Sequence, residues 1–339
     1  MAGRNHSLLL EALRYDVTPA GLHYVLVHYD VPDVDGSGWT LAVGGQVTND
    51  LVLDLERLRS YPAVSAPVTL ECAGNGRAHL RPRPVSQPWL EGAVGTAVWT
   101  GARLSDVLAD AGPTDKAVDV VLTGADHGIE RGVEQDYARA LPLAQARRSD
   151  VLLAYEMNGA PLPPQHGFPV RVIVPGWYGM TSVKWLTSIT VTDKPDEGFQ
   201  NAVAYRFKAD LDDVGEPVTS IAPRALMVPP GFPDFGSRRR IVEAGPVALS
   251  GRAWSGNGPI TSVDISTNGG RTWQDTVLEP SLGTHAWARW STTWQAAPGN
   301  HELCVRATDA TGASQPLEPP WNAQGMANNA VQRVPVHAR

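Results

Sequence analysis

The segment Val68–Leu80, with the sequence VTLECAGNGRAHL, presents a single cysteine in a glycine-rich turn. Cys72 follows a run of residues typical of a β-strand, and Arg77 comes five positions later. The only other cysteine is Cys304, so the sequence has neither a disulfide framework nor a paired-cysteine zinc motif. A thiol acts as a metal ligand or nucleophile only as the thiolate, which backbone N–H groups and nearby cations favour. The turn is therefore equally compatible with a reactive or metal-bound Cys72 and with a buried structural cysteine.

Composition argues against several classes of function. The 339 residues suffice for two domains, and the net charge is -7, with dispersed basic residues apart from Arg238–Arg240. Nucleic acid is therefore not an expected partner. No run of eighteen apolar residues predicts a membrane span. The first sixteen residues contain only Leu8–Leu10 as an apolar stretch and no twin arginine, so we expect no export signal and a cytoplasmic location.

The first two thirds of the chain alternate between strand-like and helix-like segments. Strands are expected over Trp39–Val47 and Val68–Cys72. Helices are expected over Leu53–Ser60, with Asp54 and Glu56 in its first turn, and over Leu104–Ala111, which is followed by Gly112. This pattern predicts a mixed α+β domain.

Beyond about Val228, short β-like runs alternate with turn residues, which is typical of an antiparallel sandwich of roughly 100 residues. We expect the domain boundary between residues 227 and 228, giving domains 1–227 and 228–339. Trp290 and Trp294 would share one face of a strand and belong to the sandwich core. The expected strands are Val247–Trp254, Ser262–Ser266, Trp287–Trp294 and Glu302–Thr308.

A second dense segment, His166–Leu186, has the sequence HGFPVRVIVPGWYGMTSVKWL. Its centre, Phe168–Val174, is strand-like, and cationic side chains bracket a Pro-Gly loop. Such cations suit a phosphorylated or otherwise anionic ligand. Taken alone, the segment is better explained as an ordinary strand with a few solvated charges.

Together, these segments resemble the molybdopterin domain of the sulfite oxidase family, which also includes plant nitrate reductases. The resemblance covers nearly the whole chain. The matching tracts of the first domain are Cys72–Arg77, Trp99–Leu108, Val151–Gly159, His166–Gly176 and Val183–Leu186. The C-terminal third resembles the immunoglobulin-like dimerisation domain of the same family through Gly251–Gly256, Val263–Trp273 and Pro319–Gly325. The resemblance implies a mixed α+β molybdopterin-binding domain, then an all-β immunoglobulin-like sandwich and a homodimer.

The implied cofactor is Mo-molybdopterin, with the Cys72 thiolate as a molybdenum ligand. Soft sulfur ligands suit a metal that cycles between oxidation states. Arg77 matches a substrate-binding arginine, and Tyr205 matches a tyrosine beside the reacting oxygen. The residues that match cofactor-contacting positions are Tyr24, Val25, His28, Cys72, Asp126, His166, Arg171, Ser182, Val183 and Lys184.

Two departures from the family pattern concern the substrate. Members that oxidise sulfite carry arginines at the positions of Leu26 and Gln324, so only Arg77 remains of the usual three. A hydrogen bond to a charged group contributes roughly 1.5–3 kcal/mol, so two losses weaken dianion binding by about two to four powers of ten. The inference requires that no other cation compensates. Leu26 and Val27 would also make one wall of the pocket apolar.

The sequence therefore predicts a molybdenum oxidoreductase that transfers an oxygen atom to or from a small sulfur or nitrogen oxyanion or oxide other than ordinary sulfite. No haem domain is recognisable in the chain, so a separate electron acceptor or donor protein is expected. Two alternatives remain: a slow sulfite dehydrogenase, and a non-catalytic binding protein that retains the fold. Hydrolase and dinucleotide functions lack their usual motifs in this sequence.

Overall fold

The computed structural model describes residues 5–339. Residues 1–4, which begin the segment in which no export signal is predicted, lie outside the described residues. The chain forms two compact units, and each is assembled from separate stretches of sequence. The first comprises residues up to His6, Val25–Ala66 and Ala97–Thr219. The second comprises Ser7–Tyr24, Pro67–Thr96 and Ser220–Arg339. The boundary expected after residue 227 stays a prediction.

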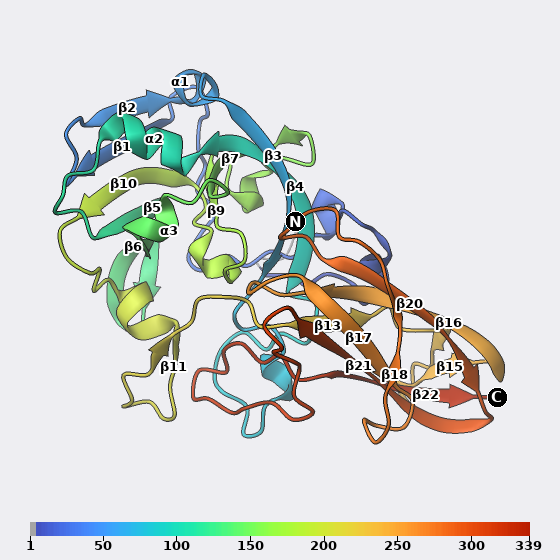
Figure 1. Cartoon of the computed structure of the whole chain (residues 1–339). Helices are drawn as coiled ribbons and strands as arrows, with labels where there is room; N and C mark the ends of the chain where they lie inside the picture. Colours follow the sequence, from blue (N-terminus) through green and yellow to red (C-terminus); the bar gives the residue numbers. More distant parts are fainter. Residues whose placement is uncertain (1–4) are drawn as a thin grey trace. The chain divides into compact units, whose positions relative to one another are not determined.

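The first unit contains a five-stranded sheet in the order β2-β1-β10-β5-β6 (Figure 1). Strand β1 runs parallel to β10, and the other neighbours are antiparallel. The strands are β1 Thr40–Gly45, β2 Leu51–Asp54, β5 Asp119–Glu130, β6 Val133–Pro142 and β10 Leu186–Thr192.

A second sheet has the order β3-β4-β7-β8, with β9 also paired to β7. The chain passes from one unit to the other within β3 and within β4. These strands are β3 Ala63–Glu71, β4 Val94–Arg103, β7 Leu152–Met157, β8 Ala160–Pro161 and β9 Arg171–Ile173. The first unit also holds the two-stranded ribbon of β11 Arg206–Phe207 and β12 Glu216–Pro217.

Short helices connect the strands of the first unit. The α-helices are α1 Leu55–Arg59, α2 Leu104–Ala111 and α3 Leu143–Ala146. Turns of 3-10 helix are η4 Pro164–His166 and η5 Gly179–Thr181, and η6 Gln200–Ala204 is a π-helix. None of the helices described between residues 5 and 339 is long and apolar enough to cross a membrane.

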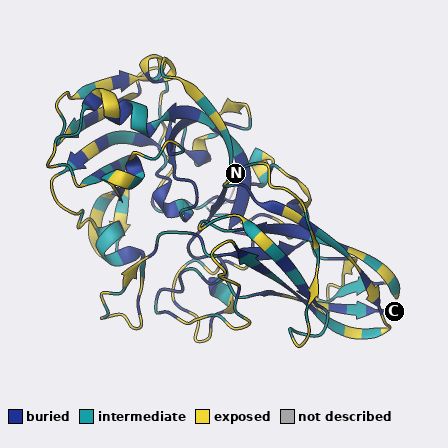
Figure 2. Cartoon of the chain, viewed as in Figure 1, coloured by how far each residue is buried: buried dark blue, intermediate teal, exposed yellow. Residues whose placement is uncertain are grey.

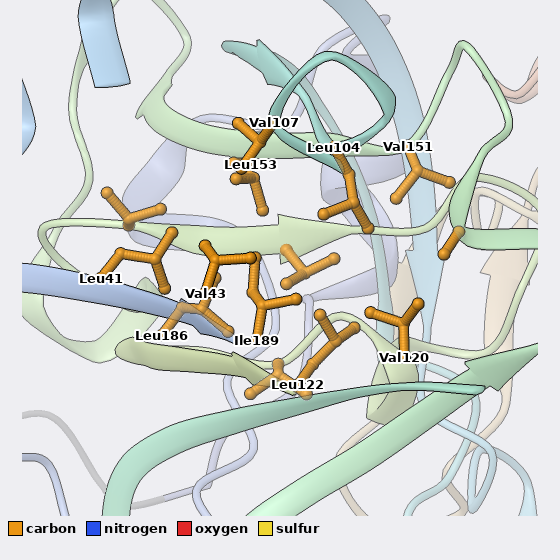
Figure 3. Packing of buried hydrophobic residues seen from close by; sticks show 14 of the residues in the cluster. Leu41, Val43, Leu104, Val107, Val120, Leu122, Val151, Leu153, Leu186 and Ile189 are labelled. Atoms are coloured by element: carbon orange, nitrogen blue, oxygen red, sulfur yellow. The ribbon is translucent and has the colours of Figure 1, made fainter. Parts of the chain in front are cut away.

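The core of the first unit lies where α2 packs with the strands. Leu104, Val107, Leu108 and Ala111 of α2 are buried, at the spacing that places side chains on one helical face. Figure 3 shows Leu104 and Val107 gathered with side chains of β1, β5, β7 and β10. At about 25 cal/mol per Å² of apolar area, burial of such a cluster is a main source of stability.

The second unit is built around a β-sandwich. One sheet has the order β13-β16-β20-β19, and the other has the order β14-β15-β22-β21-β17-β18. The first sheet consists of β13 Arg224–Met227, β16 Gly245–Trp254, β19 Val277–Leu278 and β20 Ala288–Ala296. The second sheet consists of β14 Phe232–Pro233, β15 Arg240–Val242, β17 Ile260–Ser266, β18 Gln274–Asp275, β21 Gly299–Asp309 and β22 Gln332–Ala338. The 3-10 turns of this unit are η1 Leu10–Arg14, η2 Ala20–Leu22 and η3 Arg77–His79.

Alternation of buried and exposed residues places one face of each sandwich strand in the core (Figure 2). Trp290 and Trp294 both belong to this core, as their two-residue periodicity predicts. The mixed α+β fold followed by an all-β sandwich is thus confirmed.

Some of the predicted element boundaries are wrong. The segment Leu53–Ser60 is not helical throughout, because Leu51–Asp54 pairs with β1 and Asp54 caps α1 by accepting a hydrogen bond from the Arg57 amide. Strand β1 ends at Gly45, whose φ of +92° breaks the extended backbone. The strand expected over Phe168–Val174 shrinks to Arg171–Ile173. Helix α2 has the predicted bounds, and Gly112 ends it with φ +67°.

Candidate active site

Cys72 lies directly after β3, in a turn closed by main-chain hydrogen bonds of the second unit. The Asn75 amide donates to the Cys72 carbonyl at 2.9 Å, and the Cys72 amide donates to the Ala93 carbonyl at 2.9 Å. A Cβ atom on Gly74 would lie 2.5 Å from Nη1 of Arg77, so the close approach of the guanidinium requires glycine there. The turn therefore holds a thiol and a cation next to each other.

The Arg77 guanidinium is buried and held from several sides. Nε donates to the Gln324 carbonyl at 3.0 Å, and Nη1 donates to the Gln87 carbonyl at 3.0 Å. Nη2 lies 3.4 Å from Sδ of Met326. Burial raises the pKa of the Cys72 thiol, whereas the Arg77 charge and the Gly74 amide lower it. Burial dominates, so the thiolate needs a further positive partner such as a metal ion.

A buried carboxylate at the end of β3 anchors this turn. Glu71 accepts hydrogen bonds from Arg224 at 3.0 Å, Asn75 at 2.9 Å and the Trp254 indole at 2.8 Å. Arg224 also donates to the Asn328 carbonyl at 2.7 Å. The glutamate next to Cys72 thus ties the turn to β13 and β16. The sequence analysis did not single out Glu71, although an acidic residue ending an apolar strand is itself an unusual signal.

Two cations of the first unit, the buried Arg171 and the partly buried Lys184, bond to main-chain carbonyls. Arg171 donates to the carbonyls of His166 at 3.0 Å and Ser182 at 2.9 Å. Lys184 donates to the carbonyls of Leu26 at 2.7 Å and Gln165 at 3.3 Å. The segment that brackets the Pro-Gly loop therefore concentrates positive charge in the interior of this unit.

Asp126 has one carboxylate oxygen that no donor of residues 5–339 satisfies. Its Oδ1 is buried and has no hydrogen-bond partner within the described residues. Burial raises the pKa of Asp126 to about 7, opposed by the Lys184 charge. Burial and the Arg171 charge lower the pKa of Lys184 to about 7. An orphaned carboxylate oxygen costs about 1–3 kcal/mol or more, which a bound polar ligand would offset.

His28 and Tyr205 form a direct pair in the first unit. Nε2 of His28 lies 2.5 Å from the Tyr205 hydroxyl, and the imidazole stacks on Tyr137 with centroids 4.3 Å apart. Burial, with the charges of Lys184 and Arg139, lowers the pKa of His28 to about 3. The imidazole is therefore neutral at physiological pH and can accept a hydrogen bond from the phenol.

Both parts of the chain match families of known proteins. Residues 28–200 match the oxidoreductase molybdopterin binding domain, and residues 237–339 match the Mo-co oxidoreductase dimerisation domain. Sulfite oxidase of Gallus gallus is 37% identical, over 94% of this chain and 72% of the relative. The chain belongs to the sulfite oxidase family.

The chain spans about three fifths or less of the length of some relatives that it matches. Mitochondrial sulfite oxidase of Mus musculus is 36% identical over 94% of this chain and 61% of the relative. The NAD(P)H nitrate reductase of Hordeum vulgare is 34% identical over 95% and 39%. Among solved structures, the sulfane dehydrogenase SoxCD from Paracoccus pantotrophus superposes with a TM-score of 0.84 at 25% identity, covering 97% of this chain and 85% of that chain. The family implies Mo-molybdopterin as the cofactor.

The residues of this family member fit that cofactor chemically. The buried Arg171 and the partly buried Lys184 are cations suited to a phosphate, and the orphaned Oδ1 of Asp126 can accept from an amino group of a pterin. In the second unit, Cys72 supplies the thiol that a molybdenum ion would convert to thiolate.

The structure distributes the predicted site residues over the two units. The first unit brings His28 to Tyr205, and it gathers Arg171 with His166, Ser182 and Lys184. Ser182 uses its hydroxyl to accept from the Val174 amide at 3.1 Å, so the protein already engages that oxygen. The remaining predicted positions of this unit are the buried Val25, Asp126 and Val183. The second unit brings Cys72 next to Arg77.

Leu26 and Gln324, the two positions where arginines were expected, and their neighbours all contact other residues of their own unit. Val27 is buried with Val25 and Trp185, so it packs into the interior of the first unit. Leu26 uses its carbonyl to accept from Lys184. In the second unit, Gln324 is buried and its carbonyl contacts Arg77, while Tyr24 is buried and stacks on His23.

Proposed function

We propose that this chain catalyses oxygen-atom transfer with Mo-molybdopterin as its cofactor. The observation that carries the proposal is Cys72, a buried thiol in a glycine turn beside Arg77, within a chain of the sulfite oxidase family. When bound, the molybdenum centre supplies two-electron redox chemistry and an exchangeable oxygen. The electrons pass one at a time to or from a separate protein.

Each set of protein groups has its own part in this proposal. Cys72 holds the metal, and the Arg77 charge beside it favours the thiolate. Arg171 and Lys184 hold the phosphate, and Asp126 accepts hydrogen bonds from the pterin edge. Tyr205 holds or releases a proton at its Oη during turnover, and His28 orients that hydroxyl. The remaining contacts to the cofactor would come from Tyr24, Val25, His166, Ser182 and Val183.

The substrate we propose carries less negative charge than the sulfite dianion. Leu26 and Gln324 stand where members that oxidise sulfite carry arginines. Both side chains are uncharged, so neither can offer a positive charge to an oxyanion. An organic sulfur or nitrogen compound fits this change better than sulfite does. Slow oxidation of sulfite is the second candidate, because Arg77 is retained.

The experiment that tests the proposal is a substrate screen on molybdenum-loaded protein. Sulfite, methanesulfinate, organic sulfoxides and N-oxides are compared, with an artificial electron acceptor for oxidation and an artificial donor for reduction. We expect turnover of an organic compound that exceeds turnover of sulfite. Sulfite turnover as fast as that of ordinary sulfite oxidases would overturn the substrate proposal.

The assembly is part of the same proposal. We propose a homodimer, because residues 237–339 match a dimerisation domain. Division of the chain into domains 1–227 and 228–339 and a cytoplasmic location stay predictions from the sequence.

A further inference from the structure

Arg139 differs from two other buried arginines, Arg224 and Arg252, in what surrounds its charge. Arg224 pairs with Glu71 at 3.0 Å, and Arg252 pairs with Asp16 at 2.8 Å. Arg139 is equally buried, with 4% of its surface exposed, yet it makes no ion pair among the described residues. Asp196 acts on it only at longer range. Arg139 is therefore a buried cation whose charge no anionic group of residues 5–339 neutralises at contact distance.

The position of Arg139 is defined by strand β6 and by the π-helix η6. Its guanidinium carbon lies 5.4 Å from the centroid of the Tyr205 ring. Nη1 donates to the Gln200 carbonyl, whereas Nε is buried without a hydrogen-bond partner in the described part of the chain. The same charge acts on His28, which bonds to the Tyr205 hydroxyl. Arg139, His28 and Tyr205 thus form one cluster within the first unit.

A purely structural role explains this arrangement only in part. One N–H group suffices to brace η6 through Gln200, and that contact needs no positive charge. Burial of a charge without an anionic partner is unfavourable even after relaxation of its surroundings, and the face of the Tyr205 ring offsets only part of that cost. Burial lowers the pKa of Arg139, but a guanidinium remains charged at any physiological pH. A bound anion beside Tyr205 would neutralise the charge and satisfy Nε.

We propose that Arg139 binds the anionic group of the substrate beside the Tyr205 phenol. This inference rests on the proposed function, and it names a substrate class: a singly charged oxyanion such as an organic sulfinate. One buried cation matches one negative charge, which agrees with Leu26 and Gln324 in place of two arginines. Oxidation of a sulfinate to a sulfonate takes one oxygen atom from water and releases two protons and two electrons, and the electrons pass to the separate acceptor protein.

The test compares an anionic and a neutral ligand on molybdenum-loaded protein. The variants are Arg139→Met, which removes the charge at similar volume, and Arg139→Lys, which retains it. Arg148→Met is the control, because Arg148 belongs to the same unit and already pairs with Asp150. Binding of methanesulfonate is measured by isothermal titration calorimetry, and KM is measured for methanesulfinate oxidation and for dimethyl sulfoxide reduction.

We expect Arg139→Met to weaken methanesulfonate binding by about ten- to a hundredfold, the usual range for loss of a hydrogen bond to a charged group. Arg139→Lys should recover part of that affinity, and KM for dimethyl sulfoxide should stay the same. An equal loss for the neutral and anionic ligands, or no loss for either, would show that Arg139 only braces η6. The calorimetry needs no turnover, so it tests Arg139 separately from the proposed function. An inactive parent protein that binds methanesulfonate through Arg139 would overturn the proposed function but leave anion binding at Arg139 standing.

Discussion

At the scale of single residues, the proposed chemistry depends on Cys72, whose buried thiol needs a strong positive partner to become a thiolate. We predict that Cys72→Ala protein contains no molybdenum, whereas the parent contains about one atom per chain after expression in a cofactor-competent host. Metal analysis of both proteins checks this. Cys304→Ala is the matched control, because Cys304 is also buried but belongs to strand β21 of the sandwich. A parent free of molybdenum would instead favour a non-catalytic binding protein.

Tyr205 provides a second prediction at this scale. Tyr205→Phe removes the hydroxyl that lies 2.5 Å from His28 and leaves the aromatic ring under Arg139. If the phenol takes part in proton movement, kcat should fall by about a hundredfold or more, with unchanged molybdenum content. Steady-state kinetics with the best substrate of the screen measures the effect. Tyr61→Phe, which loses only a surface hydrogen bond to Asp110, should keep the parent kcat.

Candidate site residues can be predicted from the sequence where they lie close together in one motif. Cys72 and Arg77 share one turn, and Arg171 and Lys184 flank one loop, so the sequence alone offers both pairs as candidates; their roles stay predictions. Arg139 could not, because its significance depends on Tyr205 and Gln200, whose distance from it in space is not visible in the sequence.

At the scale of secondary-structure elements, the buried pair of Glu71 and Arg224 joins β3 to β13. We predict that Glu71→Ala lowers the free energy of unfolding by about 3–5 kcal/mol, because it leaves the Arg224 charge buried without its partner. Denaturant unfolding measures the change. Glu279→Ala is the control, since Glu279 and Arg289 form a half-exposed pair at 3.7 Å, and its loss should cost at most about 1 kcal/mol. Equal losses in the two variants would contradict the role of the buried pair.

Elements could be predicted where local signals agree. Helix α2 has an apolar face and a terminal glycine, and both its ends were predicted correctly. The segment before α1 has leucines at a spacing that suits a helix, but pairing with β1 makes Leu51–Asp54 a strand. Strand pairing is a long-range interaction, so it overrides local preference without leaving a local signal.

At the scale of the whole molecule, the match of residues 237–339 to a dimerisation domain predicts a homodimer. Sedimentation equilibrium should give twice the chain mass of 36.3 kDa at micromolar concentration. Dilution should shift the mass toward one chain only at much lower concentrations. A mass of 36.3 kDa throughout would contradict the prediction.

The electrostatically interacting side chains of Asp126 and Lys184 make the stability of the cofactor-free protein depend on pH. The folded-state pKa of Lys184, about 7, lies below the ordinary 10.5, so between these values the unfolded chain binds more protons and stability rises with pH. The folded-state pKa of Asp126, also about 7, lies above the ordinary 3.8, so between 3.8 and 7 the folded chain binds more protons and stability falls with rising pH. The two contributions together are least favourable near pH 7.

We therefore predict that the free energy of unfolding of the cofactor-free parent has a minimum near pH 7. Variants that lack the ionisable group of Asp126 or Lys184 should lose one side of this minimum. Lys184→Met should remove the rise above pH 7, and Asp126→Asn should remove the fall below it. Denaturant unfolding at pH 5, 7 and 9 measures both differences. The cofactor should remove the minimum, because its phosphate favours the charged lysine and its pterin satisfies the carboxylate. A minimum that persists in loaded protein would show that the two residues do not contact the cofactor.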